Sequence, residues 1–331
     1  MKKIKLEIEN LLNKKYSLGK IKEIKQIKHN NINSNNFQIL TRRKKYVVRF
    51  VTDGSNYKKI ETICKILNFC KKHNVKIVEP IKNKKKSFFD REKRYYVTKY
   101  YDGKTFSGKI EEIKNLAKTT ATLHTILNKT KIKYTFKPDL QNYKFLTNDE
   151  IKKIRKILNK RKLDQTDLRI KNNLNNIEKQ INKIKEMGKS VDTKMLSKQL
   201  IHRDIHPNNV IFKNNFVEAI IDFNGMRKDY LISDVAFTCF RFAMFNTKDP
   251  KKIKKRLNVF LKIYLEKNNK IEKELEYLKY FFIFEMLGKL SMILRSRFFY
   301  NSNLWIIDFE KNLEYLKLVE KIGDINIKKI N

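Results

Sequence analysis

The stretch between residues 200 and 237 combines the residue types that handle phosphate groups together with a metal ion. Asp204 closes a His202-x-Asp204 motif, and Asn209 follows five positions later. Asp222 stands eighteen positions after Asp204, inside the apolar segment IIDF. An aspartate in a loop can accept a hydrogen bond from a hydroxyl group and orient it in line with phosphorus. Asn209 and Asp222 offer the oxygen ligands that Mg²⁺ prefers. The spacing therefore predicts phosphoryl transfer, with Asp204 as the catalytic residue and Asn209 and Asp222 as the metal ligands.

Two short strands are expected to hold these ligands. The segments QLIHRDIHPNNVIF and FVEAIIDFN are rich in β-branched and aromatic residues, which is typical of strands. We expect the runs VIF and AIIDF to form a hairpin that carries both metal ligands at its ends. An isolated HxD or Asp-Phe pair is common in loops between strands. The complete set H-x-D-x-x-x-x-N with a strand-embedded Asp-Phe is far more specific.

The residue pattern changes from mostly strand-like to mostly helical near residue 102, which predicts an α+β fold. The first hundred residues contain one helical segment, 57–73, among strand-like runs, which are YSLGKIKEIKQI, FQILTR, KYVVRFV and YYVTKYY. Helical patterns follow at 110–127, at 150–185 and from residue 233 to the end. We therefore expect a mostly antiparallel β lobe over residues 1–101 and a mostly helical lobe over residues 102–331.

These motifs resemble those of the aminoglycoside phosphotransferase/choline kinase superfamily, which is related to the protein kinases. HRDIHPNNVIF resembles its catalytic loop, and AIIDF resembles its metal-binding segment. ISDVAF, with Asp234 as its aspartate, is similar to an Asp-Leu-Ala helix start, and LAKTTATLHTI to a helix ending in Leu-His. The resemblance covers residues 15–245. It implies a bilobal protein-kinase-like fold, ATP or GTP with Mg²⁺ as cofactors, and a small hydroxylated molecule as acceptor.

The resemblance also implies a phosphate-contacting cation and a partner for it in the N-terminal lobe. KYVVRFV resembles the strand that bears this cation, and Arg49 stands where a lysine is usual. A guanidinium can still bind phosphate through two parallel hydrogen bonds, although its reach differs. Glu61 resembles the glutamate that pairs with the cation. The plain alternatives are an exposed strand arginine and a solvated helix glutamate.

Further nucleotide contacts are implied at two other places. HNNINSNNF would be the turn that covers the phosphates, with Ser34 and Asn36 as contacts. It lacks the glycines of the protein-kinase version, but asparagine tolerates left-handed turn conformations. YYVTKYYDG resembles the linker between lobes, where Thr98, Lys99 and Tyr101 would contact the base through their backbone. An ordinary edge strand and turn is the alternative.

The histidines near Asp204 are expected to support the site. His202 is expected to brace the loop through backbone hydrogen bonds. His206 has two interpretations, a contact with substrate or phosphate and a structural role beside Pro207. Neither GxSxG nor HExxH occurs in the sequence, so neither a hydrolase triad nor a zinc site is supported.

The nature of the acceptor stays open at this stage. A protein kinase needs a long activation segment that ends in Ala-Pro-Glu, but Asp234 follows Asp222 by only twelve positions and no such motif follows. A small acceptor is therefore favoured, of the homoserine, amino alcohol, sugar or aminoglycoside type. Arg295 or Arg297 would suit a carboxylated acceptor, as in homoserine kinases. A degenerate, non-catalytic relative, such as a spore-coat protein, remains the alternative.

The composition is strongly basic, with 76 Lys and Arg against 35 Asp and Glu and a formal net charge of +41. Nucleic-acid binders usually concentrate such charge in a stripe or tail, whereas here it is spread over the whole chain. We therefore expect no specific nucleic-acid partner. The three cysteines form no CxxC pair, the first residues lack a signal-peptide core, and the most apolar window, residues 280–300, carries four charges. These features favour a cytoplasmic protein without a membrane span, of open oligomeric state.

Overall fold

The computed structural model describes residues 2–29, 32–51, 56–132, 145–160, 162–303 and 305–323. The chain divides into two compact units. The first unit contains residues 1–136 and 204–226, and the second contains residues 137–203 and 227–331. The predicted lobe boundary between residues 101 and 102 stays a prediction.

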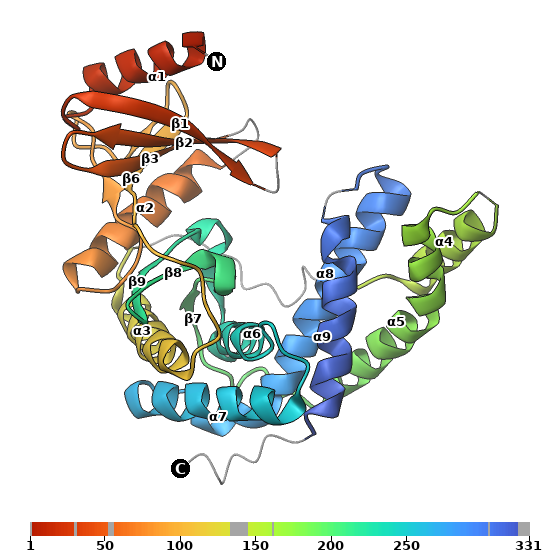
Figure 1. The fold of residues 1–331 in the computed structure, drawn as a ribbon. Helices are drawn as coiled ribbons and strands as arrows, with labels where there is room; N and C mark the ends of the chain where they lie inside the picture. The colour runs from red at the N-terminus through yellow and green to blue at the C-terminus, as the bar shows by residue number, and fades with distance from the viewer. Residues whose placement is uncertain are drawn as a thin grey trace. The chain divides into compact units, whose positions relative to one another are not determined.

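The first unit is built on an antiparallel sheet with the strand order β1-β2-β3-β6-β4, in which β5 also pairs with β6 (Figure 1). Its strands are β1 (Ile21–His29), β2 (Ile32–Thr41), β3 (Lys45–Phe50), β4 (Pro80–Ile81), β5 (Phe89–Asp90) and β6 (Tyr95–Lys99). In this register Arg49 lies opposite Asn36 on one side and opposite Tyr96 on the other. The stretch expected to be a loop over residues 29–37 is mostly strand, because β1 extends to His29 and β2 begins at Ile32.

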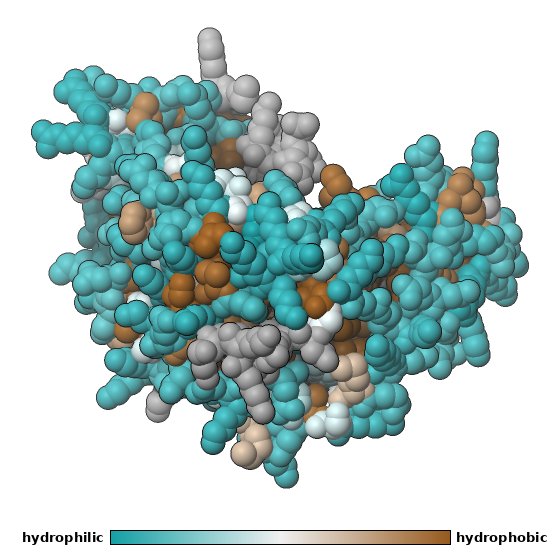
Figure 2. Space-filling model, turned by 60° about the horizontal axis from the view of Figure 1, so that its bottom comes forward, coloured by the Kyte–Doolittle hydropathy of each residue, from teal (hydrophilic) through white to brown (hydrophobic). Residues whose placement is uncertain are grey.

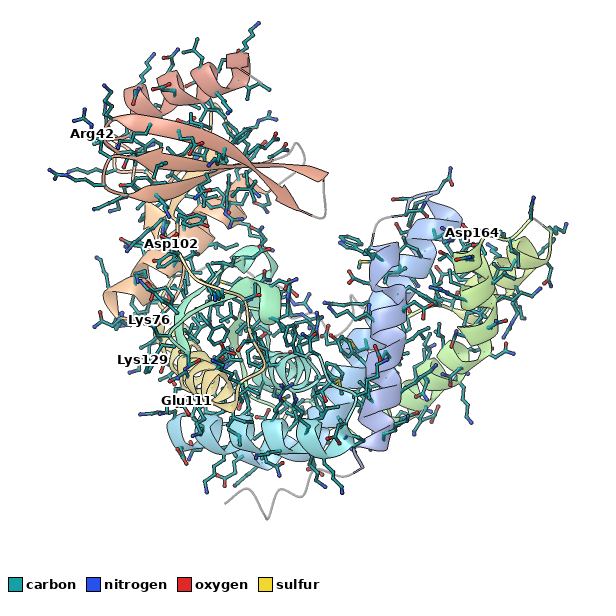
Figure 3. The ribbon with its side chains drawn as sticks, in the orientation of Figure 1. Arg42, Lys76, Asp102, Glu111, Lys129 and Asp164 are labelled. Carbon is teal, nitrogen blue, oxygen red and sulfur yellow. The ribbon has the colours of Figure 1, made fainter. Side chains whose placement is uncertain are left out.

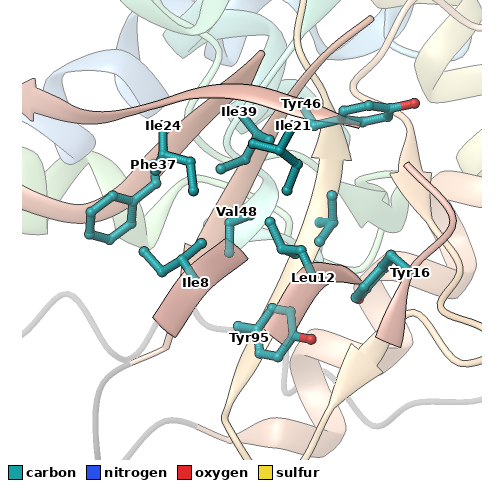
Figure 4. Close-up of a cluster of buried hydrophobic side chains, with 11 residues drawn as sticks. Ile8, Leu12, Tyr16, Ile21, Ile24, Phe37, Ile39, Tyr46, Val48 and Tyr95 are labelled. Atoms are coloured by element: carbon teal, nitrogen blue, oxygen red, sulfur yellow. The ribbon is translucent and has the colours of Figure 1, made fainter. Parts of the chain in front are cut away.

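One face of this sheet is covered by helix α1 (Lys2–Lys15), which the sequence analysis did not predict. Ile8 and Leu12 are one helical turn apart, and together with Tyr16 they enter a buried cluster on the sheet (Figure 4). The sheet contributes the remaining members, which are Ile21, Ile24, Phe37, Ile39, Tyr46, Val48, Tyr95 and Val97. Successive side chains of a strand point to opposite faces of the sheet. Because these side chains of β3 and β6 face α1, the residues between them face the other side of the sheet.

The opposite face carries helix α2 (Tyr57–Lys72), as predicted for residues 57–73. Asn56 caps the helix by accepting a hydrogen bond from the Lys59 N–H at 3.1 Å. The helix ends where the His73 N–H bonds the Cys70 carbonyl and Asn74 turns to a φ of +59°. The buried residues of α2 are Ile63, Cys64, Ile66, Leu67 and Cys70.

The predicted hairpin completes the first unit. It consists of β8 (Val210–Lys213) and β9 (Phe216–Ile220), flanked by the 3₁₀ turns η1 (Pro207–Asn209) and η2 (Phe223–Gly225), and α3 (Ile110–Lys129) packs against β9. Lys104 exchanges backbone hydrogen bonds of 2.8 and 2.9 Å with Phe212. A Cβ atom at the neighbouring Gly103 would lie 2.5 Å from Ile211 and from the Phe212 carbonyl, so only glycine permits this close approach.

The second unit is mostly helical, which confirms the predicted fold class. Its helices are α4 (Asn148–Lys160), α5 (Gln165–Lys189), α6 (Leu231–Ala243), α7 (Pro250–Lys267), α8 (Leu278–Phe299) and α9 (Phe309–Lys321), with 3₁₀ turns η3 (Glu272–Tyr277) and η4 (Ile306–Asp308). Strands β7 (Lys198–Ile201) and β10 (Arg227–Tyr230) form a short antiparallel ladder. Every residue of α6 is buried, so this helix lies at the centre of the unit.

Hydrophilic residues dominate the face of the molecule shown in Figure 2. On the face shown in Figure 2, hydrophobic side chains form only small groups among hydrophilic ones. Within the described part of the chain, no helix combines the length and apolar character needed to span a membrane.

Candidate active site

The loop of residues 202–209, here called the Asp204 loop, brings Asp204 and Asn209 into direct contact. The Asn209 side-chain amide donates to the Asp204 carbonyl at 3.0 Å and to its carboxylate Oδ2 at 3.2 Å. Asn209 is buried and the Asp204 side chain is 36% exposed. Because the amide nitrogen of Asn209 is used in these bonds, its Oδ1 is the atom left to serve as a metal ligand.

His206 approaches the same carboxylate oxygen, Asp204 Oδ2. Its Nδ1 accepts a hydrogen bond from the Asn208 N–H at 3.3 Å, which caps η1, and Pro207 occupies the first position of that turn. The neutral ring then carries its proton on Nε2, which lies 3.5 Å from Asp204 Oδ2. The structure therefore places His206 beside the carboxylate that was predicted to be catalytic.

Asp222 lies at the same end of the hairpin as Asn209. Val210 pairs with Ile220 in the ladder, and the Ile221 N–H donates to the Asn209 carbonyl at 2.9 Å. Asp222 itself adopts a left-handed conformation with φ +63°, and its carboxylate does not cap η2. A short backbone path thus holds the two predicted metal ligands together.

The two predicted ligands fit Mg²⁺ better than a metal whose ligands all come from the protein. Among the described residues, no group of three or more His, Cys, Asp or Glu side chains is arranged to hold a metal ion. Mg²⁺ is commonly held by one or two carboxylates together with water and substrate phosphates. One carboxylate and one amide oxygen match that donor set.

Arg49 and Asp222 line the same small pocket of about 20 Å³. Its other walls come from α2, β6, Val78 and η2, through Ile60, Ile63, Cys64, Leu67, Tyr96, Thr98, Val78, Phe223 and Asn224. Because Tyr46 and Val48 face the α1 cluster, alternation along β3 turns Arg49 toward α2 and this pocket. The predicted phosphate-contacting cation, Arg49, and one predicted metal ligand, Asp222, therefore line the same pocket.

Tyr96 and Thr98 also line this pocket; Tyr96 was not predicted, and Thr98 was predicted only as a backbone contact to the base. Burial raises the pKa of Tyr96 to about 12, an effect that Arg49 partly opposes. Thr98 is buried, and its hydroxyl has no hydrogen-bond partner among the described residues. Strand alternation could have identified both, since Tyr96 is paired with Arg49 and Thr98 is two residues further along the same face.

Glu61 has a different partner from the one that was expected. Its carboxylate pairs with Arg91 at 2.6 Å and with Lys65 at 3.3 Å, and the Arg91 hydrogen bond is the main cause of its lowered pKa. No pair between Glu61 and Arg49 forms in the described part of the chain, so the expected pairing was wrong. Arg91 comes from the turn after β5, which brings a competing cation to the exposed edge of α2. A role for Glu61 in binding nucleotide stays a prediction.

Of the other predicted nucleotide contacts, Ser34, Asn36 and Lys99 lie in the same sheet, and Tyr101 follows the end of β6. Ser34 belongs to β2, but its side chain lies outside the described part of the structure. Asn36 is the cross-strand neighbour of Arg49. The Lys99 N–H bonds the Glu79 carbonyl at 2.8 Å, so a backbone contact from Lys99 to a base would have to come from its carbonyl. The Tyr101 hydroxyl bonds the Ile77 carbonyl at 3.2 Å.

Asp234 fixes the start of the Asp204 loop within the second unit. This fully buried carboxylate accepts the N–H of His202 at 2.9 Å and the N–H of Arg203 at 2.8 Å. His202 is also fully buried. Asp234 therefore holds the backbone where the chain leaves β7.

The arginines considered for a carboxylated acceptor are already paired. Arg295 binds both carboxylate oxygens of Glu150, at 2.7 and 2.8 Å, and the Phe145 carbonyl at 2.8 Å. Arg297 binds Asp167 at 2.8 Å and also pairs with Asp164, which is labelled near the α4–α5 connection in Figure 3. These contacts join α8 to α4 and α5, so both arginines have structural partners.

Several solved structures with a similar fold are small-molecule kinases by name. An amicoumacin kinase, solved with AMP-PNP and Ca²⁺, aligns over 99% of both chains with a TM-score of 0.69 and 11% identity. A spectinomycin phosphotransferase, solved with ADP and spectinomycin, aligns over 98% of this chain and 96% of its own, with a TM-score of 0.66 and 16% identity. The choline kinase of Streptococcus pneumoniae aligns over 96% and 98%, with a TM-score of 0.60 and 16% identity. These similarities confirm the predicted kinase-like fold.

Comparison of the sequence with protein families gives a direct assignment. No curated protein matches the sequence significantly. Residues 23–257, which include Arg49 and the whole Asp204 loop, match the phosphotransferase enzyme family, and this confirms the resemblance drawn from the motifs. The chain therefore belongs to the phosphotransferase enzyme family.

Proposed function

We propose that this chain transfers the γ-phosphate of ATP or GTP to a hydroxyl group of a small molecule. The observation that carries the proposal is the contact between Asp204 and Asn209, with Asp222 held beside Asn209 by the Ile221 backbone. Arg49 shares a pocket wall with Asp222 and supplies a positive charge for the phosphates.

The proposed reaction is a direct in-line transfer without a phosphorylated enzyme. Asp204 accepts the hydrogen bond of the acceptor hydroxyl and takes its proton as the new oxygen–phosphorus bond forms and the bond to the nucleoside diphosphate breaks. Mg²⁺, held by Asn209 Oδ1 and the Asp222 carboxylate, would neutralise the β- and γ-phosphates. The guanidinium of Arg49 is suited to the same phosphate oxygens.

The short path from Asp222 to the next helix supports a small acceptor. The 3₁₀ turn η2 and strand β10 fill the chain after Asp222, and α6 begins at Leu231. This leaves no length for an activation segment that binds a peptide.

The ion pairs of Arg295 and Arg297 remove the support for a carboxylated acceptor that the sequence had suggested. We therefore favour an amino alcohol, sugar or aminoglycoside type of acceptor over homoserine. The solved proteins of this fold that carry amicoumacin, spectinomycin and choline kinase names are consistent with that choice.

The test of this function measures the release of nucleoside diphosphate from MgATP and MgGTP in the presence of a panel of hydroxylated acceptors. Choline, ethanolamine, sugars, aminoglycosides and homoserine form the panel. We expect acceptor-dependent turnover in the native chain and a loss of about 10²-fold or more in Asp204→Asn, because general-base catalysis contributes roughly 10²–10⁴-fold. Equal turnover in both proteins would refute the role of Asp204. Nucleotide binding without turnover on any acceptor would favour a non-catalytic member of the family.

A further inference from the structure

Arg203, the residue before Asp204, has an unusual backbone conformation. Its φ is +79°, in the left-handed region that a residue with a long side chain rarely adopts. Such a conformation persists only where its surroundings fix it, and it is concentrated at functional sites. Glycine adopts the same φ without steric cost. The presence of arginine here therefore calls for contacts that hold it.

The side chain of Arg203 provides these contacts within the second unit. Its Nη1 donates to Glu285 Oε1 on α8, and its Nε lies 3.7 Å from Asp229 Oδ2 on β10. The three side chains are only 7%, 3% and 2% exposed, respectively. Arg227 binds Asp229 as well, at 2.7 and 2.8 Å. A network of two arginines and two buried carboxylates thus holds the Arg203 side chain in one place.

The backbone of Arg203 is fixed at the same time. Its N–H donates to Asp234 Oδ1 at 2.8 Å, next to the His202 N–H on Oδ2. With its nitrogen and its side chain both held, Arg203 has little freedom to change φ. The direction in which the chain continues to Asp204 is set by that angle.

We propose that Arg203 is a positioning residue for the reaction, and this inference rests on the proposed function. Its pairs with Glu285 and Asp229 maintain the left-handed backbone that directs Asp204 toward the acceptor hydroxyl. Arg203 neither touches the acceptor nor receives its proton. Loss of the pairs releases the backbone to ordinary φ values and turns the Asp204 carboxylate out of line.

Two substitutions in the full chain separate this role from simple stabilisation. Arg203→Ala and Arg203→Gly remove the same ion pairs and leave Glu285 and Asp229 in the same state, but only glycine adopts φ +79° freely. We expect Arg203→Ala to lower kcat for MgATP turnover about tenfold or more relative to Arg203→Gly, with the KM for MgATP within twofold in both. Arg256→Met is the control, because Arg256 is a buried arginine of α7 that bonds the Ala243 and Phe245 carbonyls. It should lower the melting temperature and leave kcat unchanged.

Hydrogen–deuterium exchange of the peptide 200–209 gives a readout that needs no turnover. The amides of His202 and Arg203 should exchange slowly in the native chain and in Arg203→Gly, and at least tenfold faster in Arg203→Ala. Equal kcat and equal exchange in the two variants would overturn the proposal. If the native chain itself turns over no nucleotide, the proposed function fails. Whether Arg203 holds the loop is then decided by the exchange rates alone, which should be higher in Arg203→Ala than in the native chain and in Arg203→Gly.

Discussion

The side-chain amide of Asn209 bonds both the carbonyl and the carboxylate of Asp204, at 3.0 and 3.2 Å. One residue thereby orients the proposed catalytic base with its nitrogen and presents its oxygen to the proposed metal. The two tasks use different atoms of one amide, so they can be separated by substitution.

Asn209→Asp keeps an oxygen ligand but loses the N–H donor and places a second negative charge beside Asp204. Like charges this close raise the pKa of a carboxylate and disturb its orientation. We expect kcat to fall by about 10²-fold while Mg²⁺-nucleotide binding persists. Asn209→Ala should weaken binding as well. Titration calorimetry with MgATP beside steady-state kinetics checks both, and a normal kcat in Asn209→Asp would contradict the arrangement.

Thr98 lines the Arg49 pocket with a buried hydroxyl that has no partner among the described residues. Replacing such a group by an isosteric apolar one removes a desolvation cost of about 1–3 kcal/mol. Thr98→Val is therefore expected to raise the free energy of unfolding by about 1 kcal/mol in urea denaturation.

Thr41→Val is the matched control for Thr98→Val. The Thr41 hydroxyl is also buried, but it donates to the Lys44 carbonyl at 2.9 Å and accepts the Lys44 N–H at 3.0 Å. This variant should lose about 1 kcal/mol or more of stability. Destabilisation of similar size in both variants would show that Thr98 has a partner in solution.

The Glu150–Arg295 pair predicts a dependence of stability on pH. The Arg295 hydrogen bonds are the largest cause that lowers the pKa of Glu150, to about 2. A carboxylate with a lowered pKa stabilises the fold above its unfolded pKa of about 4.3, and this contribution is lost as pH falls toward 2. We expect Glu150→Gln to cost about 1 kcal/mol at pH 7, because solvent screens this partly exposed pair, and markedly less at pH 3.

Urea unfolding of the native chain and of Glu150→Gln at pH 7, 4 and 3 measures this difference. Asp149→Asn is the control, because it changes the neighbouring exposed carboxylate. It should have little effect on the free energy of unfolding at any of these pH values. A cost of Glu150→Gln that is independent of pH would mean that the ion pair does not lower the Glu150 pKa.

Local sequence patterns predicted much of the fold. Strands over residues 45–51 and 95–101 and the helix over 57–73 were predictable, because alternation and helical spacing reflect burial on one face. Helix α1 was missed because Ile4, Leu6 and Ile8 alternate with charged residues as in a strand, although Ile8, Leu11 and Leu12 are at helical spacing. The Asn-rich stretch of residues 29–37 was expected to be a loop, and pairing across the sheet extends it into strands.

The motif spacing placed Asn209 close to Asp204 and Asp222 at the same end of the hairpin as Asn209, since short connections leave few alternatives. Side-chain partners that come from distant segments were not predictable. Glu61 meets Arg91 from a turn thirty residues later, and Arg203 meets Glu285 on α8. Such pairings depend on tertiary packing, which no local pattern records.

The most direct test of the account is thermal unfolding with and without MgATP or MgGTP, in the native chain and in Asp222→Ala. A nucleotide at a hundredfold excess over its Kd stabilises the folded state by about 2.7 kcal/mol, which raises the melting temperature by several degrees. We predict this rise in the native chain, its dependence on Mg²⁺, its loss in Asp222→Ala and its retention in the exposed-site control Asp149→Ala. An equal rise in native and Asp222→Ala proteins, or no rise with either nucleotide, would contradict a metal-nucleotide site at Asp222.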